Sequence, residues 1–165
     1  MLGEVDKYTW IDTGSSFGMS ELQGAFLCAQ LEQADAVLAD RGRVFSTYLE
    51  LLAPHAAALG FGLPHVPSNC TNAYHLFYVM MPCREARDAV LEGCRERDIF
   101  PTFHYVPLHS SDAGRRFTDR PTECPVTDDV SGRLLRLPFY TYMAEADIET
   151  VTRAVVEILT AWNMR

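Results

Sequence analysis

The 165-residue sequence contains a single lysine, Lys7, and has few positive charges overall. It carries 14 lysine and arginine residues against 22 aspartate and glutamate residues, for a formal net charge of −8. This charge would repel nucleic acid and anionic membrane surfaces, so neither is expected as a partner. The sequence also lacks an apolar run long enough to cross a bilayer, and it does not open on a charged segment followed by an apolar run.

Cysteine pairs are missing as well. The five cysteines are odd in number and form no close CxxC pair; they are Cys28, Cys70, Cys83, Cys94 and Cys124. This pattern argues against a disulfide framework and a compact zinc motif, and it favours a reducing compartment. We therefore expect a cytoplasmic protein that binds no metal.

What is present fits one folded unit with a core, since 48% of the residues are hydrophobic and 22% are charged. Ser20 and Gln23 form a capping-box pattern, and apolar residues follow at helical spacing, which predicts one long helix ending near Pro54. Its apolar face is expected in the core: Leu22, Ala25, Phe26, Ala29, Leu38, Phe45, Tyr48 and Leu52.

Helices and strands alternate in the remaining sequence. Residues 74–81 are apolar on both alternating faces, which predicts a buried strand with His75 as a core residue. The pattern then predicts helix 84–97, strand 99–103, helix 128–133, strand 134–137 and a terminal helix at 147–162. Such an order predicts an α+β (or α/β) domain in which helices cover a small antiparallel sheet of about three strands.

The most distinctive polar stretch lies at residues 103–109, where His104, Tyr105 and His109 follow a predicted strand. Pro107 fixes its own φ and pushes the preceding residue into an extended conformation, so the polar rings stand on a stiff turn. Such a turn can be a buried structural feature with hydrogen-bonded histidines. Two histidines and a tyrosine in seven residues favour a ligand-binding loop.

The chain resembles the DegT/DnrJ/EryC1 family of pyridoxal-phosphate (PLP) sugar aminotransferases, whose members commonly carry an HY-x-P-x-H run. Five stretches carry the resemblance in order: Lys7-Tyr8-Thr9-Trp10 with Asp12 and Gly14-Ser15-Ser16; Met19-Ser20-Glu21-Leu22-Gln23 with Ala25; His75-Leu76-Phe77-Tyr78-Val79; residues 99–109; and Arg133 to Pro138. The Gly-Ser-Ser form is most similar to the branch that makes dTDP-4-amino-4,6-dideoxygalactose for bacterial surface polysaccharides such as lipopolysaccharide.

The resemblance implies the small C-terminal domain of the type I, aspartate-aminotransferase-like PLP fold. Residues 1–18 would form a loop arm that reaches a neighbouring subunit of a homodimer, and residues 19–165 the small domain with its long linking helix. The family's Schiff-base lysine comes earlier in the chain than Lys7 does, in a different local pattern. We therefore expect the C-terminal portion of an enzyme, inactive alone, with PLP bound mainly by an absent N-terminal domain.

The resemblance also implies the chemistry: an amino group passes from glutamate, through PLP, to a nucleotide-linked 4-keto-6-deoxysugar. Ser16, or Ser15 if the register differs by one, would contact the cofactor phosphate of the neighbouring subunit. His104, Tyr105 and His109 would line the substrate side and hydrogen-bond sugar hydroxyls or the diphosphate.

Three alternatives remain open from the sequence. A metal site could use His104 and His109 with Cys124 or Asp112, although their spacing matches no compact zinc motif. The chain could instead be a non-catalytic module that binds a sugar nucleotide or a partner protein. The arginines that follow the turn could hold a diphosphate or form an exposed basic loop; they are Arg115, Arg116 and Arg120.

Overall fold

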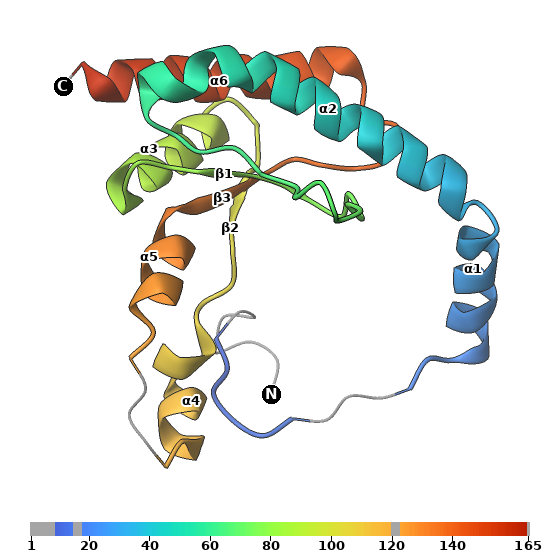
Figure 1. Cartoon of the computed structure of the whole chain (residues 1–165). Coiled ribbons are helices and arrows are strands. Elements are labelled where there is room, and N and C mark those ends of the chain that lie inside the picture. Colours follow the sequence, from blue (N-terminus) through green and yellow to red (C-terminus); the bar gives the residue numbers. More distant parts are fainter. Residues whose placement is uncertain (1–8, 15–17, 120–122, 165) are drawn as a thin grey trace.

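A three-stranded antiparallel sheet lies at the centre of the computed structural model, which describes residues 9–14, 18–119 and 123–164 (Figure 1). The strands are β1 (Phe77–Met80), β2 (Thr102–Phe103) and β3 (Leu134–Leu137), in the spatial order β1-β3-β2. The central strand β3 pairs with both neighbours, with Val79 opposite Leu135 and Thr102 opposite Arg136. The predicted small antiparallel sheet is confirmed.

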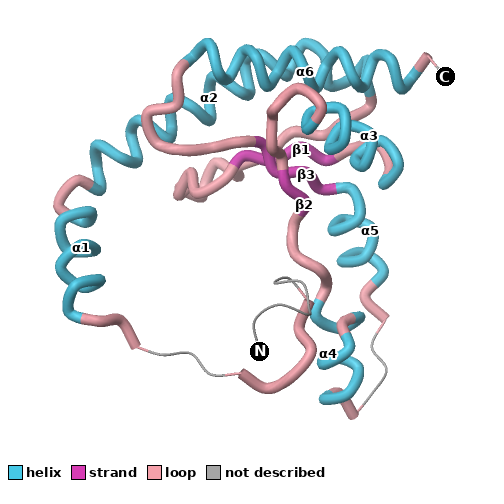
Figure 2. The backbone as a smooth tube through the Cα atoms, turned by 180° about the vertical axis from the view of Figure 1, so that it is seen from behind, coloured by secondary structure: helices cyan, strands magenta, loops and turns pink. Residues whose placement is uncertain are grey.

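Three helices supply the other half of the core: α2 (Ala34–Leu59), α3 (Arg84–Arg95) and α6 (Glu145–Asn163). Figure 2 shows α2 and α6 running side by side over the sheet, with α3 next to them. Every second residue of β1 and β3 is fully buried, whereas the residues between them are half-buried. The strand predicted to be buried on both faces is therefore covered on one face only, which is the pattern of a two-layer domain.

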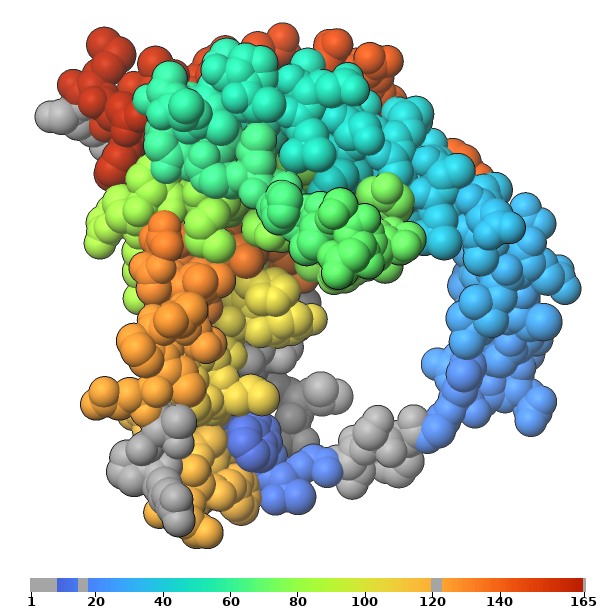
Figure 3. Space-filling view, viewed as in Figure 1, coloured from blue at the N-terminus to red at the C-terminus, as the bar shows by residue number. Residues whose placement is uncertain are grey.

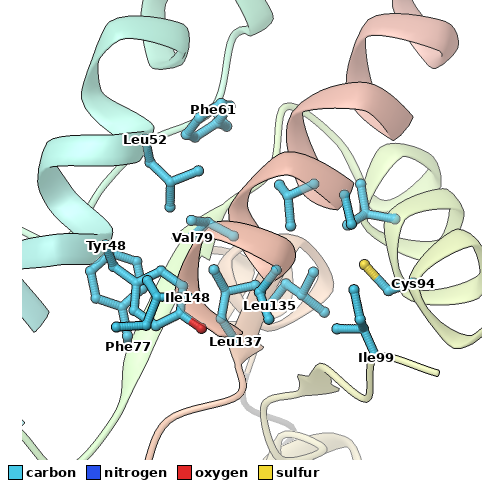
Figure 4. Close-up of a cluster of buried hydrophobic side chains, with 14 of the residues drawn as sticks. Tyr48, Leu52, Phe61, Phe77, Val79, Cys94, Ile99, Leu135, Leu137 and Ile148 are labelled. Carbon is cyan, nitrogen blue, oxygen red and sulfur yellow. The ribbon is translucent and has the colours of Figure 1, made fainter. Parts of the chain in front are cut away.

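Tyr48 of α2 lies at the centre of this core and has no exposed surface. Its ring stacks on Phe77 with 4.8 Å between centroids (Figure 4). Its hydroxyl donates a 2.8 Å hydrogen bond to the Pro138 carbonyl. Burial raises the pKa of the Tyr48 hydroxyl, which therefore stays protonated. The contact joins α2 to the segment that leaves β3.

The predicted single long helix is in fact two helices, α1 (Glu21–Leu31) and α2, with a break at Glu32 and Gln33. The predicted capping box at the start is confirmed, because the Gln23 N–H donates to Ser20 Oγ at 3.3 Å and the Ser20 N–H donates to Gln23 Oε1 at 2.9 Å. The predicted end near Pro54 is wrong. Pro54 lies on the exposed side of α2, and the helix continues to Leu59; Gly60 follows it with a φ of 73° and caps its end.

The expected core face of the long helix is only half correct. Phe45, Tyr48 and Leu52 are buried as predicted, but α1 has no buried residue. Leu22 is 84% exposed and Phe26 is 69% exposed, and Figure 3 shows the chain around α1 standing away from the body of the domain. Helical spacing identifies an apolar face, but it does not say what covers that face.

His75 is also placed differently from its prediction. It precedes β1 and is exposed, because Tyr74 adopts a φ of 47° that interrupts the extended chain. Arg41 of α2 donates hydrogen bonds to the carbonyls of Tyr74 (2.6 Å) and His75 (2.8 Å) and so holds this segment by its backbone.

The second half of the chain contains two elements that the sequence pattern missed, the 3-10 helix η1 (Leu108–Ser110) and helix α4 (Asp112–Phe117). Ser111 joins them, since its hydroxyl donates to the Leu108 carbonyl (2.7 Å) and accepts from the Gly114 N–H (3.1 Å). Helix α5 (Pro125–Arg133) is longer than predicted. None of the described helices combines the length and the apolar character needed to cross a membrane.

Candidate functional site

The topology of the sheet brings three segments to one edge. Strands β1 and β2 are both antiparallel to β3, so their carboxyl ends meet beside the start of β3. At this edge β1 leads into α3, β2 leads into the loop of His104 and Tyr105, and α5 ends at β3 (Figure 1). The segments that follow β1 and β2 and the segment that precedes β3 are far apart in sequence, but they therefore lie close together in space.

A cavity of about 490 Å³ lies at this edge, and we name it the His104 cleft. It is lined by Arg84, Arg87, Phe103, His104, Tyr105, Val106, Pro107, Ser110, Asp128, Ser131 and Gly132. Two of the three predicted substrate residues, His104 and Tyr105, thus share a cavity, with their rings edge-on at 5.3 Å. Arg136 of β3 lies over the Tyr105 ring at 5.5 Å and donates to the Phe103 carbonyl at 3.3 Å.

The imidazole of His104 favours its neutral form. Partial burial lowers the pKa of His104, and the positive charge of Arg136 and the neighbouring His75 lower it further. Its Nδ1 atom is buried without a hydrogen-bond partner. A neutral imidazole offers one N–H donor and one acceptor, so His104 has a hydrogen-bonding position left for a ligand.

His109, the third predicted substrate residue, lines an adjacent cavity of about 540 Å³, which we name the His109 cavity. Its Nε2 atom lies 3.2 Å from a carboxylate oxygen of Asp128 on α5, so this pair connects η1 to α5. Ser110 and Asp128 line both cavities, and Arg115 lies on the wall of the His109 cavity. The three predicted substrate residues are thus divided between two neighbouring cavities.

The described part of the arm, residues 9–14, lies against α4 of the same chain. The Trp10 carbonyl accepts from the Ala113 N–H at 3.0 Å, and Arg116 donates to the Ile11 carbonyl at 2.8 Å. The Trp10 ring stacks on Phe117 with 5.6 Å between centroids. Arg116, expected as a diphosphate ligand or an exposed cation, is exposed and binds the arm.

Some predicted positions lie outside the described residues. These are Ser15 and Ser16, the predicted contacts to the cofactor phosphate, together with Lys7 and Arg120. The reach of the arm into a neighbouring subunit, and the contact with the cofactor, stay predictions.

Sequence reasoning missed Arg84 and Arg87 in the first turn of α3. Arg87 is only 7% exposed, and its Nε lies 2.9 Å from Asp88 Oδ1. The available signal was its position on the apolar face of the helix, between Ala86 and Val90. A charged residue on such a face is unusual unless it has a partner.

The described residues do not fit covalent attachment of PLP, because none of them is a lysine. They also do not gather three or more histidine, cysteine or acidic side chains into a metal site, so His104, His109, Asp112 and Cys124 form no such set. The arrangement that remains is a pair of cavities with arginine, histidine and hydroxyl groups, together with Asp128 in both and Glu123 in the His109 cavity, which suits a hydroxylated ligand.

Residues 2–156 match the model of the DegT/DnrJ/EryC1/StrS aminotransferase family. The chain belongs to this family. Solved structures agree: TlmJ, an aminotransferase from Streptoalloteichus hindustanus, is 25% identical with a TM-score of 0.72, over 82% of this chain and 35% of TlmJ. DesV from S. venezuelae, solved in complex with a ketimine intermediate, is 27% identical with a TM-score of 0.76, over 94% of this chain and 41% of DesV.

A third similar structure is Helicobacter pylori PseC, an aminotransferase involved in the biosynthesis of pseudoaminic acid. It is 18% identical with a TM-score of 0.76, over 96% of this chain and 43% of PseC, and it supports the fold alone. Other matching structures were solved in PLP and PMP forms. The fold is thus the predicted small-domain part of the type I PLP aminotransferases, and the chain spans well under half the length of these relatives.

Proposed function

We propose that this chain is the C-terminal part of a PLP-dependent aminotransferase that moves an amino group from glutamate to a nucleotide-linked 4-keto-6-deoxysugar. The match to the aminotransferase family over residues 2–156 carries the proposal. The product class would be that of the dTDP-4-amino-4,6-dideoxygalactose branch, used for surface polysaccharides. The whole enzyme would be a cytoplasmic homodimer.

In this proposal the chain supplies binding groups rather than the reacting amine. PLP, held mainly by the rest of the enzyme, supplies the electron sink for amino transfer. His104, Tyr105 and His109 hydrogen-bond the sugar nucleotide, which the two cavities partly enclose. Ser16, with Ser15 as the alternative, donates a hydrogen bond to the cofactor phosphate of the neighbouring subunit.

The test separates the two half-reactions by stopped-flow kinetics in the full-length gene product that contains this chain. His104→Gln and His109→Gln should weaken binding of the sugar nucleotide by about tenfold while leaving the glutamate half-reaction unchanged. Ser16→Ala should weaken cofactor binding by about tenfold to a hundredfold with little effect on the sugar nucleotide. His55→Gln is the matched control, because His55 is an exposed histidine on α2. If both site variants behave like the His55 control, these histidines are structural and the substrate assignment fails.

A second candidate function follows from the absence of lysine among the described residues. The chain would then be a non-catalytic module that binds a sugar nucleotide or a partner protein. Genomic DNA upstream of Met1 discriminates the two: an in-frame segment encoding a cofactor lysine supports the enzyme, and its absence supports the module.

A further inference from the structure

Three buried side-chain nitrogens in the described part of the chain lack a hydrogen-bond partner, and all three lie around the His104 cleft. They are Arg87 Nε, His104 Nδ1 and Arg136 Nε. Arg87 and His104 line the cleft, and Arg136 lies over the ring of Tyr105, which lines it too. Because roughly 90% or more of buried polar groups in folded proteins are hydrogen-bonded, this concentration in one place indicates a missing ligand.

Arg87 is the strongest of the three observations. Its side chain is 9% exposed, and its Nε is within ion-pair distance of Asp88 without the alignment of a hydrogen bond. A guanidinium group has five N–H donors in a planar fork, and a buried charge is costly unless it is paired and hydrogen-bonded. Arg87 therefore has donors to offer to an acceptor in the cleft.

The surroundings of Arg87 favour an anion. Arg84 lies one turn earlier on α3 and shares Asp88 with it, at 3.9 Å. The first turn of α3 faces the same cleft, and a helix N-terminus carries partial positive charge. Glu85 offsets part of this charge, because its carboxylate accepts hydrogen bonds from its own N–H and from Cys83. Asp128, the one carboxylate among the described residues that line the cleft, is paired with His109. Two arginines thus stand beside two carboxylates, Asp88 and Glu85, neither of which lines the cleft.

We propose that the His104 cleft is a subsite for a phosphoryl group, bound by the guanidinium groups of Arg84 and Arg87, with His104 as a further hydrogen-bond partner. Arginine forks match phosphate oxygens in paired hydrogen bonds, which is why they recur in phosphate sites. The group can belong to a nucleotide-linked ligand, in which case the inference rests on the proposed function. It can also be free inorganic phosphate, which needs no enzymatic activity of this chain.

Equilibrium dialysis of the 165-residue chain against radiolabelled inorganic phosphate, and separately against a labelled nucleoside diphosphate, tests the proposal. The informative variant is Arg84→Gln, because its side chain is 71% exposed and its loss should not disturb folding. The matched control is Arg95→Gln, which removes the same charge from the far end of α3, where the side chain is 52% exposed. Arg87→Gln and His104→Gln complete the set, with circular dichroism to confirm that each variant folds.

Saturable binding that Arg84→Gln weakens by about tenfold, and Arg95→Gln changes by less than about twofold, would support the subsite. His104→Gln should also weaken it, so the result does not depend on the buried Arg87 variant. Inorganic phosphate that competes with the nucleoside diphosphate identifies the phosphoryl group as the shared feature. If only one of the two ligands binds, that ligand shows whether the phosphoryl group comes from free phosphate or from a nucleotide.

The proposal is overturned if neither ligand binds, or if Arg84→Gln and Arg95→Gln bind equally well. Since dialysis requires no turnover, its result is independent of the aminotransferase assay. Phosphate binding by the chain together with an inactive full-length protein would count against the proposed function alone. An active full-length protein with no effect of Arg84→Gln would count against the subsite alone.

Discussion

Gly114 allows α4 to approach η1 more closely than any other residue would permit, and Gly114→Ala tests whether this approach holds the turn that carries His109. A Cβ atom at position 114 would lie 2.8 Å from the Leu108 carbonyl carbon and 3.0 Å from Ser111 Oγ. The Leu108 carbonyl oxygen would be closer to this Cβ than either of them. Ordinary contact begins at 3.4 Å, so η1 and α4 would have to separate by more than 0.6 Å. His109 lies on η1 and would move with it.

The expected cost combines two opposing effects. Alanine in a helix interior gains about 1 kcal/mol over glycine, but overpacking costs about 1–3 kcal/mol or more, and each Ser111 hydrogen bond that is lost costs about 1 kcal/mol. We expect a net loss of about 1–3 kcal/mol for this region, which corresponds to roughly a fivefold to hundredfold faster amide exchange. Hydrogen-exchange mass spectrometry of peptides covering residues 106–118 measures it, because a six-residue helix can open without global unfolding.

Gly132→Ala is the matched control. It also lies in a short helix, α5, and a Cβ there would meet nothing within 4 Å. We expect its exchange to be unchanged or slower. If Gly114→Ala and Gly132→Ala show the same protection across residues 106–118, the close approach of α4 to η1 does not hold the turn, and the reasoning fails.

Three further predictions concern the core, the surface and the titration of the site. Tyr48→Phe should lower the free energy of unfolding by about 1–2 kcal/mol in urea melts, because it removes the hydrogen bond to the Pro138 carbonyl. Tyr140→Phe, at an exposed hydroxyl, should change the free energy of unfolding by less than about 0.5 kcal/mol, and equal effects of the two changes would contradict the Tyr48 contact. The isolated chain should show no transaminase activity and should self-associate in sedimentation. Leu22→Glu plus Phe26→Glu should reduce association, whereas Val126→Glu, at an exposed hydrophobic residue on α5, should leave it unchanged; a strictly monomeric parent would refute this. Folding lowers the pKa of His104 below 6.5, so the unfolded chain binds more protons than the folded chain as the pH falls through that value. The free energy of unfolding should therefore decrease below pH 6.5 in the parent and decrease less in His104→Gln. Identical pH profiles of the two proteins in urea melts would exclude this linkage.

Local patterns predicted those elements whose own residues define them. The capping box of α1, the terminal helix α6 and the strand 134–137 are set by side chains a few residues apart, and all three are present. Helix α4 could not be predicted in this way. It is six residues long, and it depends on the Ser111 cap and on contacts with η1 and the arm.

The same limit applies to the candidate site. The polar turn at 103–109 was visible because its residues are consecutive, but Arg84 and Arg87 join it only through the pairing of β1 and β2 with β3. A one-dimensional pattern shows Arg87 as an isolated charge on an apolar helix face. The division of His104 and His109 between two cavities likewise arises from α5, through Asp128. Long-range pairing, which no local spacing encodes, assembles these cavities.

The contact between the arm and α4 sets the earliest point in protein synthesis at which residues 9–14 can dock. Asp12 and Arg116, which form an ion pair at 2.8 Å, are 104 positions apart in the sequence. A ribosome that adds about 5–20 residues per second needs roughly 5–20 s to make the intervening chain. Residues 9–14 therefore wait until α4 has been made before they can dock, and the contact between them beside the turn of His109 cannot form earlier.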